Sequence, residues 1–212
     1  LSIGTGMTLA AVMTGVFITN MGVPMWLGVI GGVATGALMG LINGLNIAFL
    51  KLPPFIATLA MMMIAQGLAL VISGVRPIYF STSAPNFKDI ALGTLIPGLP
   101  NAVLITGVLA IIAFFVLGKT LLGRYTFAIG SNEEATRLSG VNTRRWLVLI
   151  YVFAGTFTGI AGVVMASRLD SAQPQLGMGY ELQAIAAVII GGTSLMGGRG
   201  SILGTVIGAL IM

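Results

Sequence analysis

The sequence predicts an all-α protein, a polytopic bundle of transmembrane helices. Of its 212 residues, 57% are hydrophobic and 7% are charged, whereas about 25% of the residues of an ordinary soluble domain are charged. Apolar segments of helical length recur along the chain and are separated by polar turns. The one long polar run covers residues 123–145 and contrasts with the apolar sequence on both sides of it. These observations exclude a soluble domain.

Five apolar segments are candidate membrane spans. The second apolar segment is separated from the third by Lys51, Leu52, Pro53 and Pro54. Neither proline can donate a backbone hydrogen bond, so the helix breaks there. Residues 76–100 contain four prolines, and we expect them to form a long extramembrane loop with a short interfacial turn. Residues 168–180 form a polar connector. The predicted spans cover residues 3–18, 25–50, 55–75, 103–117 and 146–167.

The last part of the chain holds two apolar segments that are too short to cross a bilayer. Residues 181–190 and 202–212 are separated by GGTSLMGGRG at 191–200. A membrane-spanning helix needs about 20 residues. The region is therefore either one broken helix that extends to about Gly198 or a re-entrant pair, and such backbone is tolerated at membrane depth only where protein or water surrounds it.

The second span carries a glycine at every fourth position. In water, each helix-interior glycine costs about 1 kcal/mol relative to alanine. In lipid, glycines spaced in this way let another helix backbone approach closely. We therefore expect this face to pack against a neighbouring helix and not to line a pathway. The glycines are Gly28, Gly32, Gly36, Gly40 and Gly44.

The polar run at 123–145 contains a predicted short helix over residues 132–139. Ser131 is expected to cap it, with Glu134 reaching back to the Ser131 backbone in a capping box. Gly140 supplies a residue that tolerates a left-handed stop. Such a short helix is marginal alone, so it needs a packing partner. A partner subunit is the natural candidate, and a connector lying on the bilayer is the alternative.

The distribution of basic residues predicts the orientation. If residues 119–145 are cytoplasmic, alternation of the spans also puts Lys51 and Arg199 inside and makes residues 76–100 and 168–180 external. Seven basic residues then lie inside and three outside, as the positive-inside rule requires. Two acidic residues then lie inside, and Asp89, Asp170 and Glu181 lie near the outer side. The net charge of +5 is thus explained by orientation in the cell inner membrane, and nucleic acid is not an expected partner.

Several kinds of catalysis are excluded by composition. The chain has no cysteine and no histidine, so it lacks thiolate sites, the commonest metal ligand and the usual general base. It also has no P-loop motif for binding ATP. We expect no catalytic residue, no metal and no cofactor on this chain. The remaining classes are a channel or a transporter with a cytoplasmic docking helix.

The chain resembles a known transporter family. GSNEEATRLSGVNTRRW, the stretch ELQAIAAVIIGGTSLMGGRGSILGTVIGALI and the earlier GLINGLNIAFLKLPPFIATLAMM are similar to segments of the permease subunits of ribose-type monosaccharide ABC importers. The resemblance covers nearly the whole chain. It implies a pair of permeases that form a path for a monosaccharide, with a periplasmic sugar-binding protein outside and a cytoplasmic ATPase subunit, which carries ATP and Mg²⁺, inside.

The resemblance also implies roles for individual residues. The loop matching 130–140 is the family's coupling element on the ATPase, which assigns that contact to Ser131, Glu133, Glu134, Arg137 and Gly140. One departure is Gln183, where members often have an acidic residue, so this chain has no carboxylate at that position. Full members have further helices at both ends, so the chain is expected to be a fragment.

The substrate path and the function class leave alternatives open. Asn43, Asn46 and Gln66 are amide side chains within spans and are candidate path residues, or they bond between helices without meeting sugar. The alternative function is an ion-coupled secondary carrier or a passive channel. A carrier of that kind usually keeps an ionisable group within a span, and only Glu181, at a span end, comes close.

Overall fold

The computed structural model describes residues 1–81 and 83–212, which are mostly helical. Within these residues, five helical segments are long and apolar enough to cross a membrane, which confirms the predicted all-α polytopic bundle. The elements in chain order are α1 (Ile3–Gly15), the π-helical η1 (Val16–Asn20), α2 (Met25–Leu50), α3 (Pro54–Ser73), β1 (Ile78–Tyr79), α4 (Asp89–Leu92), α5 (Asn101–Lys119), α6 (Leu121–Ser131), α7 (Glu133–Leu138), α8 (Thr143–Leu169), β2 (Ser171–Ala172), α9 (Tyr180–Ile190) and α10 (Ile202–Ile211).

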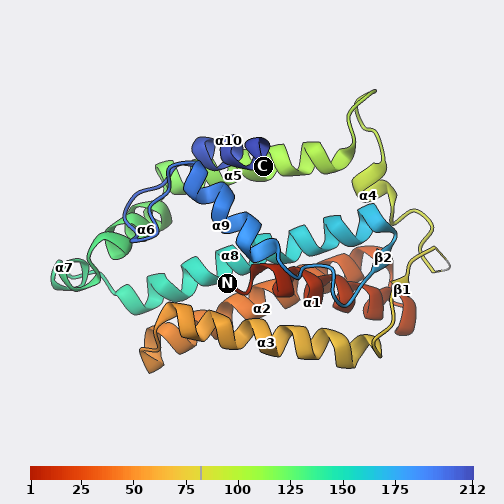
Figure 1. The fold of residues 1–212 in the computed structure, drawn as a ribbon, viewed down its shortest axis with the longest axis horizontal. Helices are drawn as coiled ribbons and strands as arrows, with labels where there is room; N and C mark the ends of the chain where they lie inside the picture. The colour runs from red at the N-terminus through yellow and green to blue at the C-terminus, as the bar shows by residue number, and fades with distance from the viewer. Residues whose placement is uncertain (82) are drawn as a thin grey trace.

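The bundle has two distinct ends. Helices α1, α2, α3 and α8 run side by side, with α7 at one end and the two strands at the other (Figure 1). We call these the α7 end and the strand end. The turn between α2 and α3 shares the α7 end with the start of α8, because the Arg144 guanidinium lies 5.9 Å from the centre of the Phe49 ring. The turn between α2 and α3 and the start of α8, which alternation of the spans predicts to be on the cytoplasmic side, therefore do lie together.

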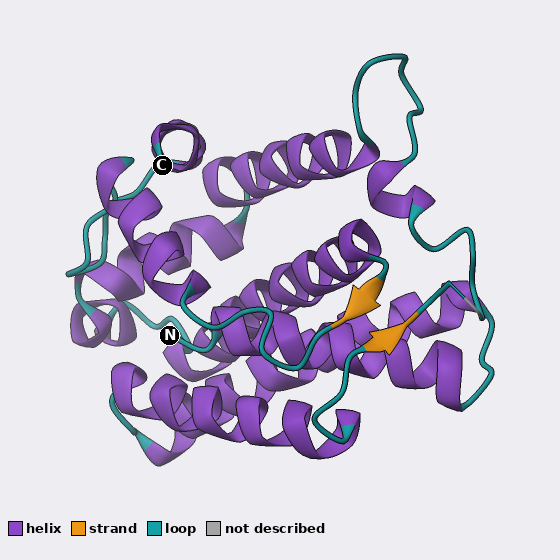
Figure 2. Cartoon of the chain, turned by 45° about the vertical axis from the view of Figure 1, so that its right-hand side comes forward, coloured by secondary structure: helices purple, strands orange, loops and turns teal. Residues whose placement is uncertain are grey.

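The strand end joins the two loops that were predicted to share a side. Strands β1 and β2 form a short antiparallel ladder in which Ile78 lies opposite Ala172 and Tyr79 opposite Ser171 (Figure 2). The 76–100 segment also sends two aromatic rings into the core, where Phe80 and Phe87 stack with their centres 4.0 Å apart. The loop is thus anchored to the bundle by backbone pairing and by buried aromatic rings.

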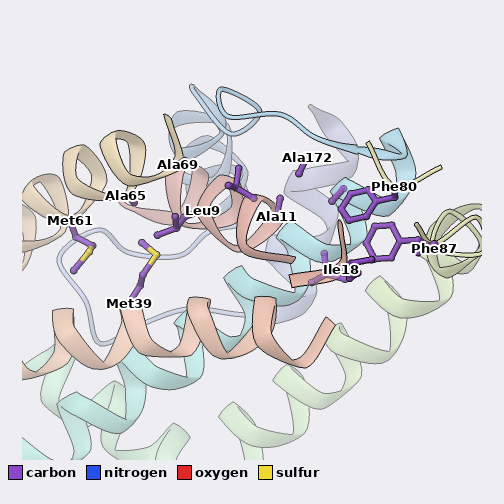
Figure 3. Packing of buried hydrophobic residues seen from close by; sticks show 14 residues of the cluster. Leu9, Ala11, Ile18, Met39, Met61, Ala65, Ala69, Phe80, Phe87 and Ala172 are labelled. Carbon is purple, nitrogen blue, oxygen red and sulfur yellow. The ribbon is translucent and has the colours of Figure 1, made fainter. Parts of the chain in front are cut away.

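The hydrophobic core surrounds α1. Leu9 of α1 is buried together with Met39 of α2 and Met61 of α3, and the Phe80 and Phe87 rings close the core at the strand end (Figure 3). Eleven of the thirteen residues of α1 are buried, so this helix is enclosed by its neighbours on nearly every side. By contrast, most of α5 is exposed, as expected for a helix whose surface meets lipid in a membrane.

The glycines of α2 lie where other backbones approach. A methyl group added to Gly36 would lie 2.6 Å from the Gly159 Cα, and one added to Gly40 would overlap the Tyr151 carbonyl oxygen, so both positions admit the α8 backbone only because they lack a Cβ. The first two glycines of the ladder face η1 and α1 at Ile18 and Thr14, and the last faces α8 at Val148. This face of α2 is therefore closely packed as expected, but Gly36 and Gly40 also line a cavity beside α8, so the expectation that the face lines no open space is wrong at these two positions.

The 168–180 connector does not stay outside the bundle, so that prediction is wrong for its second half. Gly15 of α1 lies against Ala172, whereas Gly4 lies against Gly177. These two α1 glycines are eleven residues apart, which is about 16 Å along the helix axis. The Gly177 N–H also donates to the buried Thr8 hydroxyl at 2.8 Å. The connector thus descends along α1, because paired glycines and a buried acceptor give its backbone a place to pack.

Helices α9 and α10 form a closely packed antiparallel pair. A methyl group on Gly191 would lie 2.6 Å from the Thr205 nitrogen, and one on Gly208 would lie 2.9 Å from the Gly191 nitrogen. Of the two alternatives for this region, the single broken helix extending to about Gly198 is wrong, since α9 ends at Ile190 and the chain turns back. The pair of short helices is the arrangement that the structure has.

Candidate functional site

The exposed polar element at the α7 end is built from two helices. Residues 121–131 form α6, which was not predicted, and α7 follows after Asn132. The Tyr125 ring of α6 packs against the Trp146 ring of α8 with centres 4.7 Å apart. This contact fixes α6 beside the start of α8 and leaves α7 to project from the end of the bundle.

The predicted capping role of Ser131 is wrong, because Asn132 caps α7. The Asn132 backbone is extended, with φ at −159°, and its Oδ1 accepts the Ala135 N–H at 2.9 Å. A capping residue needs non-helical backbone angles to turn its side chain towards the next turn. Ser131 is the last residue of α6 and is still helical. Ser131 and Asn132 are both residue types that cap helices well. Because Ser131 is still part of α6, Asn132 is the one that caps α7.

The predicted capping box is also absent from this part of the structure, because Glu134 pairs with Arg137. The Arg137 Nη2 donates to Glu134 Oε1 at 2.5 Å, and both side chains are about two-thirds exposed, at 63% and 64%. This hydrogen bond raises the pKa of the Arg137 guanidinium above its ordinary value. Gly140 follows α7 with a φ of +84°, in agreement with the expected left-handed stop.

Helix α7 makes few contacts with the rest of the chain. Thr136 is its one buried residue, while Glu133, Glu134, Arg137 and the neighbouring Ser131 and Gly140 are all exposed. Leu138, an apolar side chain, is 77% exposed. A short helix that is so little supported by its own chain is available to pack against another protein. The sequence-predicted coupling residues therefore lie together on one projecting surface.

A cavity of about 590 Å³ lies between α1, α2, α3 and α8. This volume is in the range of small-molecule sites, which usually occupy about 300–1,000 Å³. Its lining is mostly apolar, with a few polar side chains that could meet hydroxyl groups. These are Ser2, Asn43, Thr58, Tyr151 and Thr158.

Only one of the three candidate path amides lines this cavity. Asn43 is 4% exposed, and its Nδ2 donates to the Ser2 hydroxyl at 3.2 Å. Its Oδ1 has no hydrogen-bond partner among the described residues. Asn46 is half-buried outside the lining, and Gln66 donates to the Pro174 carbonyl oxygen at 3.1 Å, which ties α3 to the descending connector.

Glu181 lies deeper than the sequence indicated. It begins α9 beside the first turn of α1, where a methyl group on Gly4 would lie 2.5 Å from its Oε2. Ser2, in the same turn, meets Asn43, which is seven residues or about 10 Å before the end of α2. Glu181 therefore lies inside the bundle and not near the outer side. Its Oε2 is buried without a partner among residues 1–81 and 83–212.

Sequence reasoning missed several of these positions. Asn132 is a residue type that often caps helices, but its neighbour Ser131 is an equally good candidate in the sequence. Ser2, Thr58 and Thr158 gave no signal, because isolated hydroxyl residues in apolar helices usually bond their own backbone, as Thr58 does to the Pro54 carbonyl oxygen at 2.9 Å. In the part of the chain that the structure describes, no group of three or more acidic residues could hold a metal ion.

Comparison with known proteins identifies relatives along the full chain. The family described as branched-chain amino acid transport system, permease component, matches residues 1–212. The ribose import permease of Bacillus subtilis is 46% identical over 213 residues, which cover 100% of this chain and 65% of the relative. The ribose import permease of Haemophilus influenzae is 44% identical over 179 residues, covering 84% of this chain and 55% of the relative.

A third relative is named for a different sugar. The fructose import permease of Rhizobium meliloti is 39% identical over 217 residues, which cover 100% of this chain and 60% of the relative. The chain thus spans between 55% and 65% of the length of these three relatives. No solved structure matches it.

The membrane-crossing helices define a multi-pass membrane protein, with a cavity between the helices and an exposed polar helix at one end. The match over the whole chain makes the family plain. The chain belongs to the permease family described as the permease component of branched-chain amino acid transport systems, and its resemblance to ribose-type sugar permeases is confirmed.

Proposed function

We propose that this chain is part of the membrane permease subunit of an ATP-driven importer that carries a monosaccharide across the cell membrane. The observation that carries the proposal is its identity of 37–46% to relatives that are all named as permeases for the import or transport of single sugars, namely ribose, fructose, allose and arabinose. Sugars of this kind present hydroxyl groups, and the polar side chains in the cavity lining are hydroxyls and one amide.

The projecting helix α7 supports the proposal that a separate subunit supplies the energy for import. The chain has no ATP-binding loop of its own, so an ATP-driven importer requires a separate ATPase subunit. Glu133, Glu134, Arg137 and Leu138 are exposed at the α7 end, where the positive-inside rule places the cytoplasm. We assign the ATPase contact to this surface, with Ser131 and Gly140 at its edges. ATP and Mg²⁺ then bind the partner and not this chain.

The strand end is the corresponding candidate for the external partner. The ladder of β1 and β2 and the stacked Phe80 and Phe87 rings hold the 76–100 segment against α8. A firmly anchored surface at this end suits the docking of a sugar-loaded binding protein. A second permease copy would complete the path, as the resemblance to paired permeases implies, and the apolar surface of α5 faces lipid or such a neighbour.

The cavity supports a transit site with weak affinity. A sugar in transit must be released, so few convergent polar groups are needed. Asn43 offers a buried acceptor that no described residue fills. The Gln66 Oε1 is likewise buried without a partner among the described residues, but neither Gln66 nor Asn46 lines the cavity. We therefore propose Asn43 as the path residue and assign Gln66 a role in joining helices. The Gln66 hydrogen bond to Pro174 supports that second role.

The proposal is tested by uptake in proteoliposomes. The full-length protein is assembled with its ATPase subunit and binding protein, and uptake of radiolabelled ribose, fructose, allose and arabinose is measured with ATP and with a non-hydrolysable analogue inside. We expect uptake of one of these sugars to require hydrolysis. Uptake that proceeds equally with the analogue would show that the function is not ATP-driven.

One observation favours an ion-coupled carrier as the second candidate function. Glu181 has a buried carboxylate oxygen inside the bundle, and intramembrane carboxylates commonly bind the coupling ion in carriers. Uptake driven by a proton or sodium gradient without ATP, and lost in Glu181→Gln, would support this candidate. Uptake insensitive to both gradients would reject it.

A further inference from the structure

The glycine-rich segment 191–200 makes a backbone contact that its sequence did not predict. It lies at the α7 end against the last turn of α6, next to the helix assigned to the ATPase contact (Figure 1). A Cβ on Gly197 would overlap the Gly130 carbonyl oxygen, and one on Gly130 would lie 2.9 Å from the Gly198 nitrogen. A Cβ on Gly198 would lie 3.0 Å from the Ser131 Cβ. Three glycines are thus needed for this one contact.

The segment has a fixed shape of its own. The Ser194 N–H donates to the Arg199 carbonyl oxygen at 3.0 Å, and the Thr193 N–H donates to the Val188 carbonyl oxygen at 3.0 Å. Gly197 and Gly198 have φ values of +87° and +74°, which other residues rarely adopt. These hydrogen bonds and backbone angles hold the segment in one compact turn that is joined to the end of α9.

One side of this unit reaches the cavity. Leu195 lines the cavity although its side chain is 75% exposed, so it lies at the mouth. Ile185 of α9 lines the same cavity. Because α9 and α10 are in close backbone contact at Gly191 and Gly208, the segment and both helices form one body.

The other side reaches the surface assigned to the ATPase. Ser131 touches Gly198, and the next residue, Asn132, caps α7. A displacement of α7 therefore acts on residues 130 and 131 through a single extended residue. It then acts on Gly197 and Gly198 through backbone atoms, which yield less than flexible side chains.

We propose that Gly130, Gly197 and Gly198 are positioning residues that transmit movement of α7 to Leu195, and that the segment 191–200 is the gate at the α7 end of the cavity. This inference rests on the proposed function and adds to it the route by which the ATPase acts on the path. A displacement of α7 shifts the segment and opens or closes the mouth. The three glycines bind no sugar themselves.

The first test measures the gate directly in the assembled, full-length complex. Because the described sequence has no cysteine, Leu195→Cys gives one labelling site in this region, and its rate of reaction with a water-soluble maleimide is measured with and without ATP. We expect the rate to change at least about fivefold between the two states, the lower end of ordinary coupling between sites. An unchanged rate in a complex with ATP-driven uptake would overturn the proposal.

The second test interrupts the contact with one methyl group. Gly130→Ala keeps α6 helical but places a Cβ 2.9 Å from the Gly198 nitrogen, whereas the Cβ of the matched variant Gly118→Ala in α5 meets no described residue within 4 Å. We expect Gly130→Ala, and not Gly118→Ala, to abolish the ATP-dependent change at Leu195→Cys and to lower uptake at least about fivefold. Binding of the ATPase subunit should remain.

The outcomes separate the gate from the proposed function. If uptake requires ATP and Gly130→Ala behaves like Gly118→Ala, the gate proposal is wrong and the importer assignment stands. If uptake in the unmodified complex does not require ATP, the proposed function is wrong. If Gly130→Ala fails to assemble, the labelling rate of Leu195→Cys in the otherwise unmodified complex decides alone.

Discussion

The Ser167 hydroxyl joins the end of α8 to the Phe87 backbone. It donates to the Phe87 carbonyl oxygen at 2.7 Å and accepts the Ala91 N–H at 3.0 Å. Ser167 and Ala91 are both 0% exposed, so water cannot replace either bond. One side chain therefore satisfies two buried backbone groups and holds the 76–100 segment on the bundle.

We expect Ser167→Ala to destabilise the protein by about 1–3 kcal/mol, because it leaves a buried donor and a buried acceptor unpaired. The midpoint of thermal unfolding in detergent measures the effect. Ser73→Ala is the matched control, since the Ser73 hydroxyl donates to the Leu70 carbonyl oxygen in its own helix and, among residues 1–81 and 83–212, to no other segment. Equal midpoints for the two variants would contradict the anchoring role of Ser167.

The contact between α2 and α8 gives a second prediction. Gly40→Ala places a methyl group on the Tyr151 carbonyl oxygen and 3.1 Å from the Gly155 Cα. Overpacking of this kind costs about 1–3 kcal/mol, which exceeds the gain in helix propensity. We expect a lower unfolding midpoint for Gly40→Ala and an equal or higher one for Gly67→Ala in α3, where no described residue lies within 4 Å of the added methyl group. The reverse order would exclude close packing at this position.

The start of α7 gives a third prediction. Asn132→Ala removes the cap and should destabilise the helix by about 0.5–2 kcal/mol, whereas Ser131→Ala, at the end of α6, should have little effect. Amide hydrogen exchange over residues 133–138 measures the difference. We also expect Asn132→Ala to lower ATP hydrolysis that the loaded binding protein stimulates. Faster exchange in Ser131→Ala than in Asn132→Ala would restore Ser131 as the cap.

The orientation of the bundle gives a fourth prediction. Ser131 is exposed at the α7 end and Lys88 is exposed at the strand end, so single cysteines at these positions report opposite sides. We expect an impermeant reagent added outside intact cells to label Lys88→Cys but not Ser131→Cys. Labelling of Ser131→Cys from outside would reverse the assignment of both ends and of the two partner surfaces.

Much of the fold could be predicted from the sequence, because each long helix is encoded locally. The second span was predicted at 25–50 and found at Met25–Leu50, since Pro24 precedes it and the proline pair at 53–54 follows it. Helix α6 could not be predicted in the same way. Its polar residues resemble those of a loop, and its place beside α8 depends on the distant contact between Tyr125 and Trp146.

The candidate site was predictable only where it is continuous in sequence. Glu133, Glu134 and Arg137 share α7, so their proximity follows from helical spacing. The cavity instead collects Ser2, Asn43, Thr58 and Thr158 from four helices. The depth of Glu181 likewise depends on a connector that descends along α1. The two glycines that allow this descent, Gly4 and Gly177, are 173 residues apart in the chain, so no local sequence pattern links them.

The path amides give the last prediction, in which two neighbouring residues of α2 serve as test and control. Asn43→Leu removes the amide that bonds Ser2 and the buried acceptor in the cavity lining. Loss of one such hydrogen-bonding group costs about 0.5–1.5 kcal/mol, so we expect maximal sugar uptake to fall about two- to tenfold. Asn46→Leu, outside the lining, should leave maximal uptake unchanged.

Assembly with the ATPase subunit must be measured for both variants, because Asn43 also joins α2 to the first turn of α1. A packing role alone would lower the unfolding midpoint of Asn43→Leu while the assembled fraction transports at the normal rate. A path role would lower the rate of the assembled fraction itself. Normal uptake by assembled Asn43→Leu would therefore remove this residue from the path and leave its amide as a link between two helices.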